Sequence, residues 1–277
     1  MPELPEVETI ARTLAPEVVG REILAVQTFD PSALQPDPAS FAALAAGRRI
    51  TGVRRRGKLL LLDLDDRGIL AVHLRMTGRV VALCPGNEPV RQGPGPRAVL
   101  ELSEGARLCF SDVRRFGSMH AFAAGGIDAW PFYASLGPEP LGMSAAEFQA
   151  RLGQGRARIK ALLLDQRVLA GIGNIYADES LFRAGIRPDT PAAAVSPKKR
   201  DALFAAIQAV LTQAIAENGS SIRDYRDAHG DAGAFQNSFR AYGRGGQPCL
   251  ACGSIMQTMR VAGRGTTFCP RCQRAHG

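Results

Sequence analysis

Hydrophobic positions near the start of the chain recur with the period of an α-helix. A helix running from about Pro5 towards Gly20 would place five apolar residues on one face: Val7, Ile10, Ala11, Leu14 and Val18. Pro16 falls inside this stretch and is expected to kink the helix near its end. Pro2 and Glu3 would therefore lie immediately before the helix N-terminus.

Between Glu22 and about Phe122 the apolar positions change to short runs separated by Gly, Pro, Asp and Asn. This pattern predicts antiparallel strands that form a β-sandwich or a barrel. We expect the strands at residues 23–29, 49–54, 58–64, 69–74, 80–84, 98–102 and 108–111. Residues 85–96, rich in Gly and Pro, predict a long exposed loop.

A rigid Leu-Gly-Pro-Glu-Pro-Leu connector at residues 136–141 precedes a return to the helical period. Ser144 and Glu147 form a capping-box pattern, and further helices are expected near 159–164, after Gly173 and over 196–219. Residues 220–237 have no clear period, and we interpret them as a mobile loop that could close over a ligand. The expected domains are therefore 1–135, 136–235 and 236–277.

Composition and charge restrict the class of protein. The 277 residues are 45% hydrophobic and 22% charged, which is typical of a soluble globular chain. Neither a membrane-spanning run nor a signal-peptide pattern is present, so we expect a cytoplasmic protein without a membrane partner. The net charge of +8 favours a polyanionic partner, and all charged residues after Asp231 are basic or histidine.

The first residues could carry a nucleophile. If Met1 is removed, Pro2 becomes a secondary amine with Glu3 as its immediate neighbour. An α-amino group with a pKa of about 8 is substantially unprotonated near neutrality and can attack an electrophilic carbon to form a Schiff base. The alternative interpretation is structural, since Pro and Glu both suit the first turn of a helix.

Polar turns interrupt the β region. The basic run 54–58 ends in Lys58 and is either a phosphate-binding turn or an ordinary solvated one. Met76 and Phe116 each lie in a polar turn, where they could be core residues or exposed apolar tips. An apolar wedge with an arginine such as Arg114 beside it is what extrusion of a nucleotide requires.

Four cysteines near the C-terminus have the spacing of a structural zinc site: Cys249-x2-Cys252, sixteen residues, then Cys269-x2-Cys272. We expect one structural Zn²⁺ with no open ligand position. Arg264, between two glycines at a predicted turn, is placed to grip phosphate. Cys84 and Cys109 fall outside the pattern and are interpreted as core residues.

Several motifs together resemble bacterial formamidopyrimidine-DNA glycosylases. They are the N-terminal Pro-Glu-Leu-Pro-Glu-Val-Glu-Thr, the Arg-Arg-Phe-Gly turn, Leu-Gly-Pro-Glu-Pro-Leu, Gly-Ile-Gly-Asn-Ile-Tyr-Ala-x-Glu-Ser-Leu-Phe, Tyr-Gly-Arg and the four-cysteine finger. The resemblance covers the whole chain. It implies an α+β, multidomain fold: an N-terminal antiparallel β-sandwich with an N-terminal helix, a helix–two-turn–helix domain and a C-terminal zinc β-ribbon.

The resemblance also implies the activity. Double-stranded DNA would bind across the cleft between the domains, oxidised purines such as 8-oxoguanine opposite cytosine and formamidopyrimidines would be removed, and the abasic strand would be cleaved. We expect a monomer. Pro2 would attack C1′, Glu3 would transfer protons, Lys58 would assist β-elimination, and Arg264 would grip phosphate and assist δ-elimination.

DNA contacts follow from the same resemblance. Met76, Arg114 and Phe116 would fill the gap left by the flipped base, with Arg114 facing the estranged cytosine. Positions that contact DNA or support the site would be Lys160, Asn174 and Tyr242, and Glu6 is a candidate for contact with the damaged base. The chain departs from the family where a His-Asp-His run is common: it reads Gly-Pro-Gly-Pro-Arg97. That DNA contact is therefore absent or transferred to Arg97.

Two alternatives stay open. A sister enzyme resembling endonuclease VIII would prefer oxidised pyrimidines, although Leu4 and the paired Arg114 and Phe116 argue against it. A non-catalytic DNA-binding protein would use the zinc ribbon and the helical corner alone.

Overall fold

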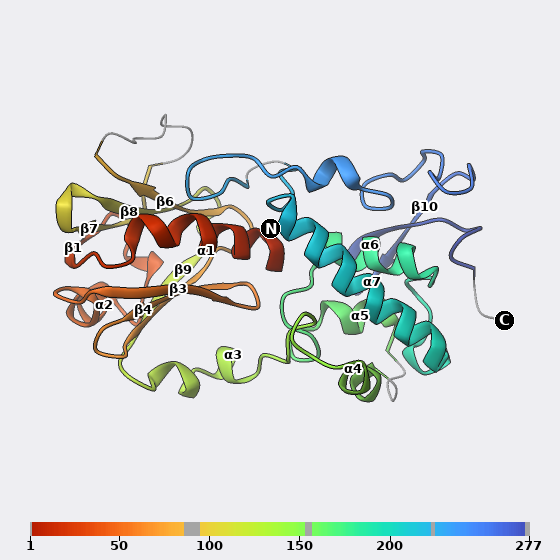
Figure 1. Cartoon of the computed structure of the whole chain (residues 1–277), viewed down its shortest axis with the longest axis horizontal. Helices are drawn as coiled ribbons and strands as arrows, with labels where there is room; N and C mark the ends of the chain where they lie inside the picture. Colours follow the sequence, from red (N-terminus) through yellow and green to blue (C-terminus); the bar gives the residue numbers. More distant parts are fainter. Residues whose placement is uncertain (1, 86–94, 153–156, 223–224, 275–277) are drawn as a thin grey trace. The chain divides into compact units, whose positions relative to one another are not determined.

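The computed structural model describes residues 2–85, 95–152, 157–222 and 225–274 (Figure 1). Contacts between Cα atoms divide the chain into two compact units. The first unit comprises Met1–Ala134 and Glu217–Ala234, and the second comprises Ser135–Ala216 and Phe235–Gly277. The expected boundary near residue 135 coincides with the division after Ala134. The second unit, however, includes the zinc ribbon, and the first unit includes Glu217–Ala234, which follows the helical region in sequence.

The first unit contains two β-sheets. One sheet has four strands in the order β1 (Ile23–Thr28), β7 (Ala98–Leu102), β8 (Arg107–Asp112), β6 (Gly78–Leu83). The other has five strands in the order β2 (Leu34–Gln35), β9 (Ser118–Phe122), β5 (Ile69–His73), β4 (Leu59–Leu64), β3 (Ile50–Arg56). All pairs are antiparallel except β2 with β9.

Both sheets contribute to one hydrophobic core, which makes the predicted β-sandwich correct. Leu60 and Val72 reach it from the five-stranded sheet, and Leu100 and Phe110 from the four-stranded sheet. Strands β6 and β8 alternate buried and half-buried positions, as a pleated strand with one face on a core requires. Helix α1 (Leu4–Val18) packs against β3, β4 and β6 with its predicted apolar face (Figure 1).

Some elements of this unit were not expected. They are β2, β9, the helices α2 (Pro38–Ala45) and α3 (Pro131–Ala134), and the 3-10 turns η1 (Pro31–Ala33), η2 (Ser103–Gly105) and η3 (Gly126–Ala129). The predicted loop 85–96 falls mostly outside the described residues. Cys84 and Cys109 are both half-buried. Cys84 packs against the hydrophobic core and its Sγ donates to Glu17 Oε2 at 3.2 Å, whereas Cys109 lies at a half-buried position of β8.

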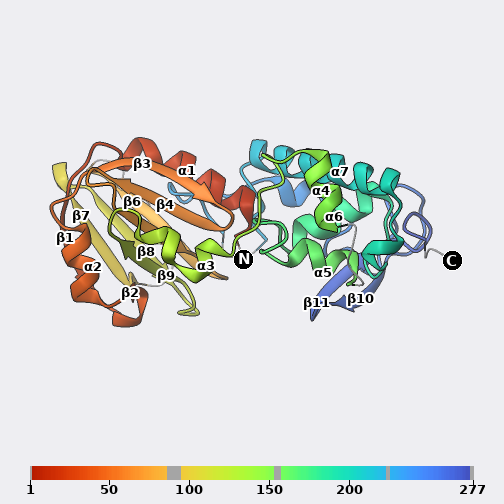
Figure 2. The same cartoon turned by 90° about the horizontal axis from the view of Figure 1, so that it is seen from below.

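The second unit is helical with one β-hairpin. Its helices are α4 (Ala145–Leu152), α5 (Ile159–Leu164), α6 (Asn174–Ala184) and α7 (Pro197–Ala216), with η4 (Ala192–Ala194) and η5 (Phe235–Ser238). The hairpin pairs β10 (Gln257–Val261) with β11 (Arg264–Phe268), which packs against α6 (Figure 2). The capping box is confirmed, since Ser144 N–H donates to Glu147 and Glu147 N–H to Ser144 Oγ. Among the residues described, none of the helices has the length and apolar character needed to cross a membrane.

Candidate functional site

The start of α1 gathers two carboxylates beside Pro2. Pro2 and Glu3 precede Leu4, the first helical residue, and both are buried. Glu6 is 1% exposed, and its Oε2 accepts a hydrogen bond from Glu3 N–H at 2.8 Å, which forms a capping box. The structure therefore places the candidate nucleophile and both candidate carboxylates together in a desolvated environment.

The segment 217–234 packs against the same carboxylate. Glu6 Oε1 accepts from Ser220 N–H at 2.8 Å and from Ser220 Oγ–H at 3.0 Å. Tyr225 Oη donates to the Glu6 carbonyl at 3.3 Å. A Cβ on Gly219, whose φ is +75°, would stand 2.9 Å from Glu6 Cγ, so this close approach requires glycine. Ser220 and Tyr225 of the predicted loop are thus joined to α1, whereas the end of that loop belongs to η5 in the second unit. Residues 223–224 lie outside the described residues.

Lys58 is the second residue of the tight turn between β3 and β4 and is 8% exposed. The register of the sheet pairs its neighbour Leu59 with His73 on β5. Burial, together with the positive charges of Arg75 and Lys58, lowers the pKa of His73 to about 3, so its imidazole is neutral at pH 7. Its Nδ1 accepts from Arg75 N–H at 3.1 Å, which leaves the proton on Nε2.

No sequence motif singles out His73 as a site residue. Only the pairing of β4 with β5 reveals its place near Lys58. Two other basic residues of the run 54–58 are engaged in ion pairs: Arg54 Nε lies 2.9 Å from Asp63 and Arg55 Nε lies 2.9 Å from Glu8. The charges of these two arginines are therefore balanced within their own unit.

Met76 and Phe116 are exposed apolar tips, with 41% and 56% of their surfaces accessible, so the core interpretation is wrong. Arg114 joins them: its Nη1 lies 3.0 Å from Met76 Sδ, and its Cζ lies 4.8 Å from the Phe116 ring centroid. We call Met76, Arg114 and Phe116 the turn cluster. It combines the apolar wedge and the arginine that filling a gap in a base stack requires.

The structure does not support a direct DNA contact by Arg97. The side chain is 4% exposed and forms an ion pair with Asp30, with Nε 2.9 Å from Oδ2. It also donates to the Gly117 carbonyl and to Ser32 Oγ. Because contact with a phosphate would require breaking these buried bonds, we correct the prediction: Arg97 is an internal residue of the first unit.

In the second unit, Lys160 and Asn174 contact β11 near the tip of the β10–β11 hairpin, where Arg264 is exposed. Lys160 is fully buried and donates to Thr266 Oγ1 at 2.8 Å, and Asn174 Nδ2 donates to the Gly265 carbonyl at 2.9 Å. Lys160 thus supports the site and does not present its charge to solvent.

Two buried acids of α6 complete this arrangement. Lys160 Nζ lies 2.6 Å from Asp178 Oδ1, and burial raises the pKa of Asp178 to about 6 while the lysine charge opposes the rise. The Glu179 carboxylate accepts from the backbone N–H groups of Arg240, Ala241 and Tyr242 at 2.8–3.1 Å. Tyr242, half-buried, is therefore fixed through its backbone. The sequence motif contained both acids, but only their burial reveals these roles.

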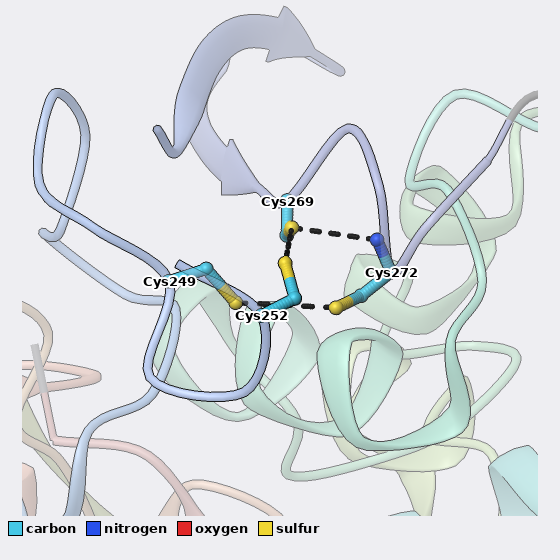
Figure 3. Close-up of side chains that lie close together, drawn as sticks. All are labelled: Cys249, Cys252, Cys269 and Cys272. Carbon is cyan, nitrogen blue, oxygen red and sulfur yellow. Dashed lines mark hydrogen bonds between the residues drawn. The ribbon is translucent and has the colours of Figure 1, made fainter. Parts of the chain in front are cut away.

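The four cysteines lie together, as Figure 3 shows, with their ligand atoms all within 4.8 Å of one another. The sulfurs of Cys249 and Cys272 are 3.9 Å apart and those of Cys252 and Cys269 are 3.5 Å apart. A tetrahedral zinc with Zn–S bonds of about 2.3 Å separates its sulfurs by about 3.8 Å. The residues therefore fit one structural Zn²⁺ with four thiolate ligands.

Family models match three successive parts of the chain. They describe a formamidopyrimidine-DNA glycosylase N-terminal domain over residues 1–119, a formamidopyrimidine-DNA glycosylase H2TH domain over 136–226, and a zinc finger found in FPG and IleRS over 246–275. The chain belongs to the formamidopyrimidine-DNA glycosylase family.

Relatives in this family match over nearly the full length. The formamidopyrimidine-DNA glycosylase of Geobacillus kaustophilus is 48% identical over 99% of this chain and 100% of its own. The crystal structure of MutM (FPG) from Thermus thermophilus has a TM-score of 0.88 and 42% identity, with both chains fully covered. Lactococcus lactis Fpg in complex with DNA containing an abasic site has a TM-score of 0.89 and 32% identity, over 99% of this chain and 100% of that one.

In this formamidopyrimidine-DNA glycosylase family member, the predicted site residues fall into separate groups. Pro2, Glu3 and Glu6 lie at the start of α1, while Lys58 lies at the β3–β4 turn. The turn cluster occupies two turns of the same unit. The second unit carries the hairpin tip and the cysteine cluster.

Proposed function

We propose that this family member is a base-excision-repair DNA glycosylase with AP lyase activity, which removes 8-oxoguanine opposite cytosine and formamidopyrimidines from double-stranded DNA. The observation that carries the proposal is the burial of Pro2 and Glu3 at the start of α1, with Glu6 bonded to the Glu3 backbone. A nucleophile held at the end of a packed helix is preorganised for attack.

The first step is base displacement. After removal of Met1, the Pro2 nitrogen attacks C1′ of the extruded nucleotide, a bond forms between them, and the bond from C1′ to the base breaks. Glu3 delivers a proton to O4′, the sugar ring opens, and the nitrogen lone pair forms an iminium with C1′. The damaged base leaves with the proton that the Pro2 nitrogen releases before it forms the iminium, and the enzyme remains covalently attached to the opened sugar.

Strand cleavage follows from the positive iminium. It acidifies the C2′ proton, whose loss expels the 3′ phosphate, and a second elimination expels the 5′ phosphate. Lys58 contacts phosphate and assists the first elimination. Arg264 binds phosphate during the second elimination. Because a guanidinium has a pKa above about 12, Arg264 acts through its charge and its hydrogen bonds and not as a proton donor.

DNA recognition uses both units. The turn cluster fills the gap left by the flipped nucleotide, with Arg114 facing the orphaned base. Asn174 and Tyr242 contact the DNA backbone near Arg264, and Lys160 supports them from within. The L. lactis complexes with DNA containing Fapy-dG or an abasic site support this choice of ligand. We propose that the enzyme acts as a cytoplasmic monomer.

An oxidised-pyrimidine glycosylase is the second candidate. One wild-type L. lactis Fpg structure, 32% identical with a TM-score of 0.88, contains DNA with an oxidized pyrimidine. Competition between duplexes that contain 8-oxoguanine or thymine glycol tests this alternative: faster excision of thymine glycol would favour it.

Borohydride trapping tests the main proposal. The mature protein is incubated with an 8-oxoguanine:cytosine duplex and borohydride, and the N-terminal peptide is analysed by mass spectrometry. We expect a reduced adduct on Pro2, and none in a control protein whose N-terminus is extended before Pro2. If the mature protein traps neither this duplex nor an abasic duplex, the amine mechanism is wrong and the non-catalytic DNA-binding alternative is favoured.

A further inference from the structure

The guanidinium of Arg97 holds the end of the turn 112–117 from inside the first unit. Nε donates to Asp30 Oδ2 at 2.9 Å, Nη1 donates to the Gly117 carbonyl at 2.7 Å, and Nη2 donates to Ser32 Oγ at 2.8 Å. Because a guanidinium is planar with its donors in fixed directions, it fixes these three acceptors relative to one another.

Asp112 holds the same turn from its other end. Its Oδ2 accepts from Gly117 N–H at 2.6 Å, and its Oδ1 accepts from Arg114 N–H at 3.1 Å and from the Thr77 hydroxyl. Asp112 is 3% exposed, and its Oδ2 lies 4.0 Å from Arg97 Nη1. Gly117 is therefore bonded to Asp112 through its N–H and to Arg97 through its carbonyl, while Thr77 joins this turn to the one that carries Met76.

The turn has little room to move at Gly117. A Cβ there would meet the His73 carbonyl at 3.0 Å and Phe110 Cζ at 3.1 Å. Arg115, between the two exposed side chains of the turn, has a φ of 55°, a left-handed conformation that is unfavourable for a residue with a side chain. Such a conformation persists where surrounding bonds determine it.

We propose that Arg97 is a positioning residue for recognition of the base opposite the lesion: through Gly117 and Asp112 it fixes the turn that presents Arg114, and it makes no contact with DNA itself. The inference rests on the proposed function for the role of Arg114. Since hydrogen bonds weaken steeply with misalignment, a displaced Arg114 loses selectivity between opposite bases before it loses attraction for DNA.

The variant Arg97→Lys tests this role. Lysine keeps the charge, but one ammonium cannot reproduce the fork that reaches three acceptors. The measurements are the affinity for a duplex with an uncleavable tetrahydrofuran abasic analogue opposite cytosine or adenine, and the excision rate of 8-oxoguanine opposite the same bases. For each measurement, we expect the ratio of the value opposite cytosine to the value opposite adenine to fall about tenfold. A change of this size corresponds to the loss of one base contact.

Arg21→Lys is the matched control. In the same unit, Arg21 also makes hydrogen bonds through its guanidinium, to the carbonyls of Glu17 and Ser103 and to the Glu104 carboxylate. It lies outside both turns, so its substitution should leave the ratio unchanged.

A double variant separates positioning from general loosening of the fold. If Arg97 acts through Arg114, then Arg97→Lys should cause no further loss of selectivity in an Arg114→Ala background. An equal loss in both backgrounds, or an unchanged ratio in folded Arg97→Lys, would overturn the proposal. In folded Arg97→Gln, which removes the charge, a salt dependence of binding reduced by about one ion would also overturn it, because that result would mean a direct phosphate contact.

Asp30→Asn provides a second route if Arg97→Lys does not fold. It removes the charge partner of Arg97 with little change in shape and should lower the ratio about threefold, as expected for loss of a charge-assisted bond. No change in the ratio would contradict the proposal.

Measurements on the wild-type protein separate the proposed function from the proposed role of Arg97. Absence of 8-oxoguanine excision together with selective binding opposite cytosine would refute the proposed function only, whereas excision without any opposite-base preference would refute the role of Arg97.

Discussion

Both oxygens of Glu6 are occupied by donors within the first unit. Oε2 accepts from the Glu3 backbone, and Oε1 accepts from the backbone and hydroxyl of Ser220. The carboxylate therefore joins the residue beside the candidate nucleophile to the segment 217–234. A contact between Glu6 and a damaged base would have to share or replace one of these bonds.

The two glutamates should respond differently to the same substitution. Glu6→Gln should destabilise the first unit by about 1–3 kcal/mol, because an amide NH2 would face a donor. Glu3→Gln should cost less stability but reduce base excision at least about 100-fold, the usual contribution of an acid–base group. Urea unfolding followed by the fluorescence of Trp130 and single-turnover excision measure both effects. Unchanged stability of Glu6→Gln would mean that the bonds to Ser220 are not maintained in solution.

The sequence predicts the role of a single residue where the signal lies in the spacing of a motif or in the position of the residue along the chain. The zinc ligands follow from the spacing of four cysteines, and Pro2 from its position in the chain. Met76 and Phe116 were ambiguous because the same residue types occur in cores and at exposed tips, and only tertiary structure distinguishes them. Of the two alternatives for Arg97, its burial supports an absent DNA contact; the sequence could not distinguish them, because the partners that hold Arg97, Asp30 and Gly117, are distant in sequence.

Strands β5 and β9 carry a cluster of rings that includes two histidines. His73 contacts Phe132, and His120 lies 4.4 Å from Trp130, measured between ring centroids. Burial is the main cause that lowers the pKa of His73 to about 3 and that of His120 to about 4, from an ordinary value of 6.5. Sequence did not predict β9, because its buried positions, Met119 and Ala121, are too few to show an alternation.

These histidines should make the first unit sensitive to acid. Their pKa values are lower in the folded state than in the unfolded state, so their contribution to stability is complete above pH 6.5. It is lost as the pH falls towards about 4 for His120 and about 3 for His73. A buried histidine adds a slope of up to about 1.4 kcal/mol per pH unit, and half-buried His120 adds less because solvent screens it.

Urea unfolding of wild type and His120→Phe between pH 7 and pH 4 measures this slope. The variant keeps an aromatic ring beside Trp130 and removes one titrating group. Its stability should therefore fall less steeply with acid than that of the wild type. Identical slopes would mean that His120 has the same pKa in the folded and unfolded states.

The β10–β11 hairpin depends on two supports: Lys160 holds its tip, and the four cysteines hold its base. Removal of zinc by a chelator should unfold the hairpin and abolish binding to an abasic-analogue duplex, because thiolate ligation supplies folding free energy to such modules. The fluorescence of Trp130 in the first unit should stay unchanged. Cys252→Ser should reproduce the effect and Cys84→Ser should not. Tight DNA binding without metal would contradict this role of the hairpin.

For the whole molecule, the count of 34 lysines and arginines overstates the cations available to DNA. Arg54, Arg55 and Arg97 are ion-paired within the first unit, and Lys160 is ion-paired and buried in the second. Sequence composition could indicate a polyanionic partner, but it could not distinguish these internal charges from exposed ones such as Arg264. The number of phosphate contacts is therefore expected to be smaller than the count of basic residues suggests.

Salt dependence measures how many cations reach the phosphates. The logarithm of the binding constant for an abasic-analogue duplex should fall linearly with the logarithm of salt concentration, with a slope of about −0.9 for each phosphate contacted. Arg264→Ala should make the slope shallower by about one unit. Arg48→Ala, which removes a residue paired with Asp66, should leave it unchanged. A slope near zero for the wild type would contradict DNA binding through phosphate contacts. An unchanged slope for Arg264→Ala would mean that the hairpin tip acts without its charge, and would leave Lys58 in the first unit as the principal phosphate contact.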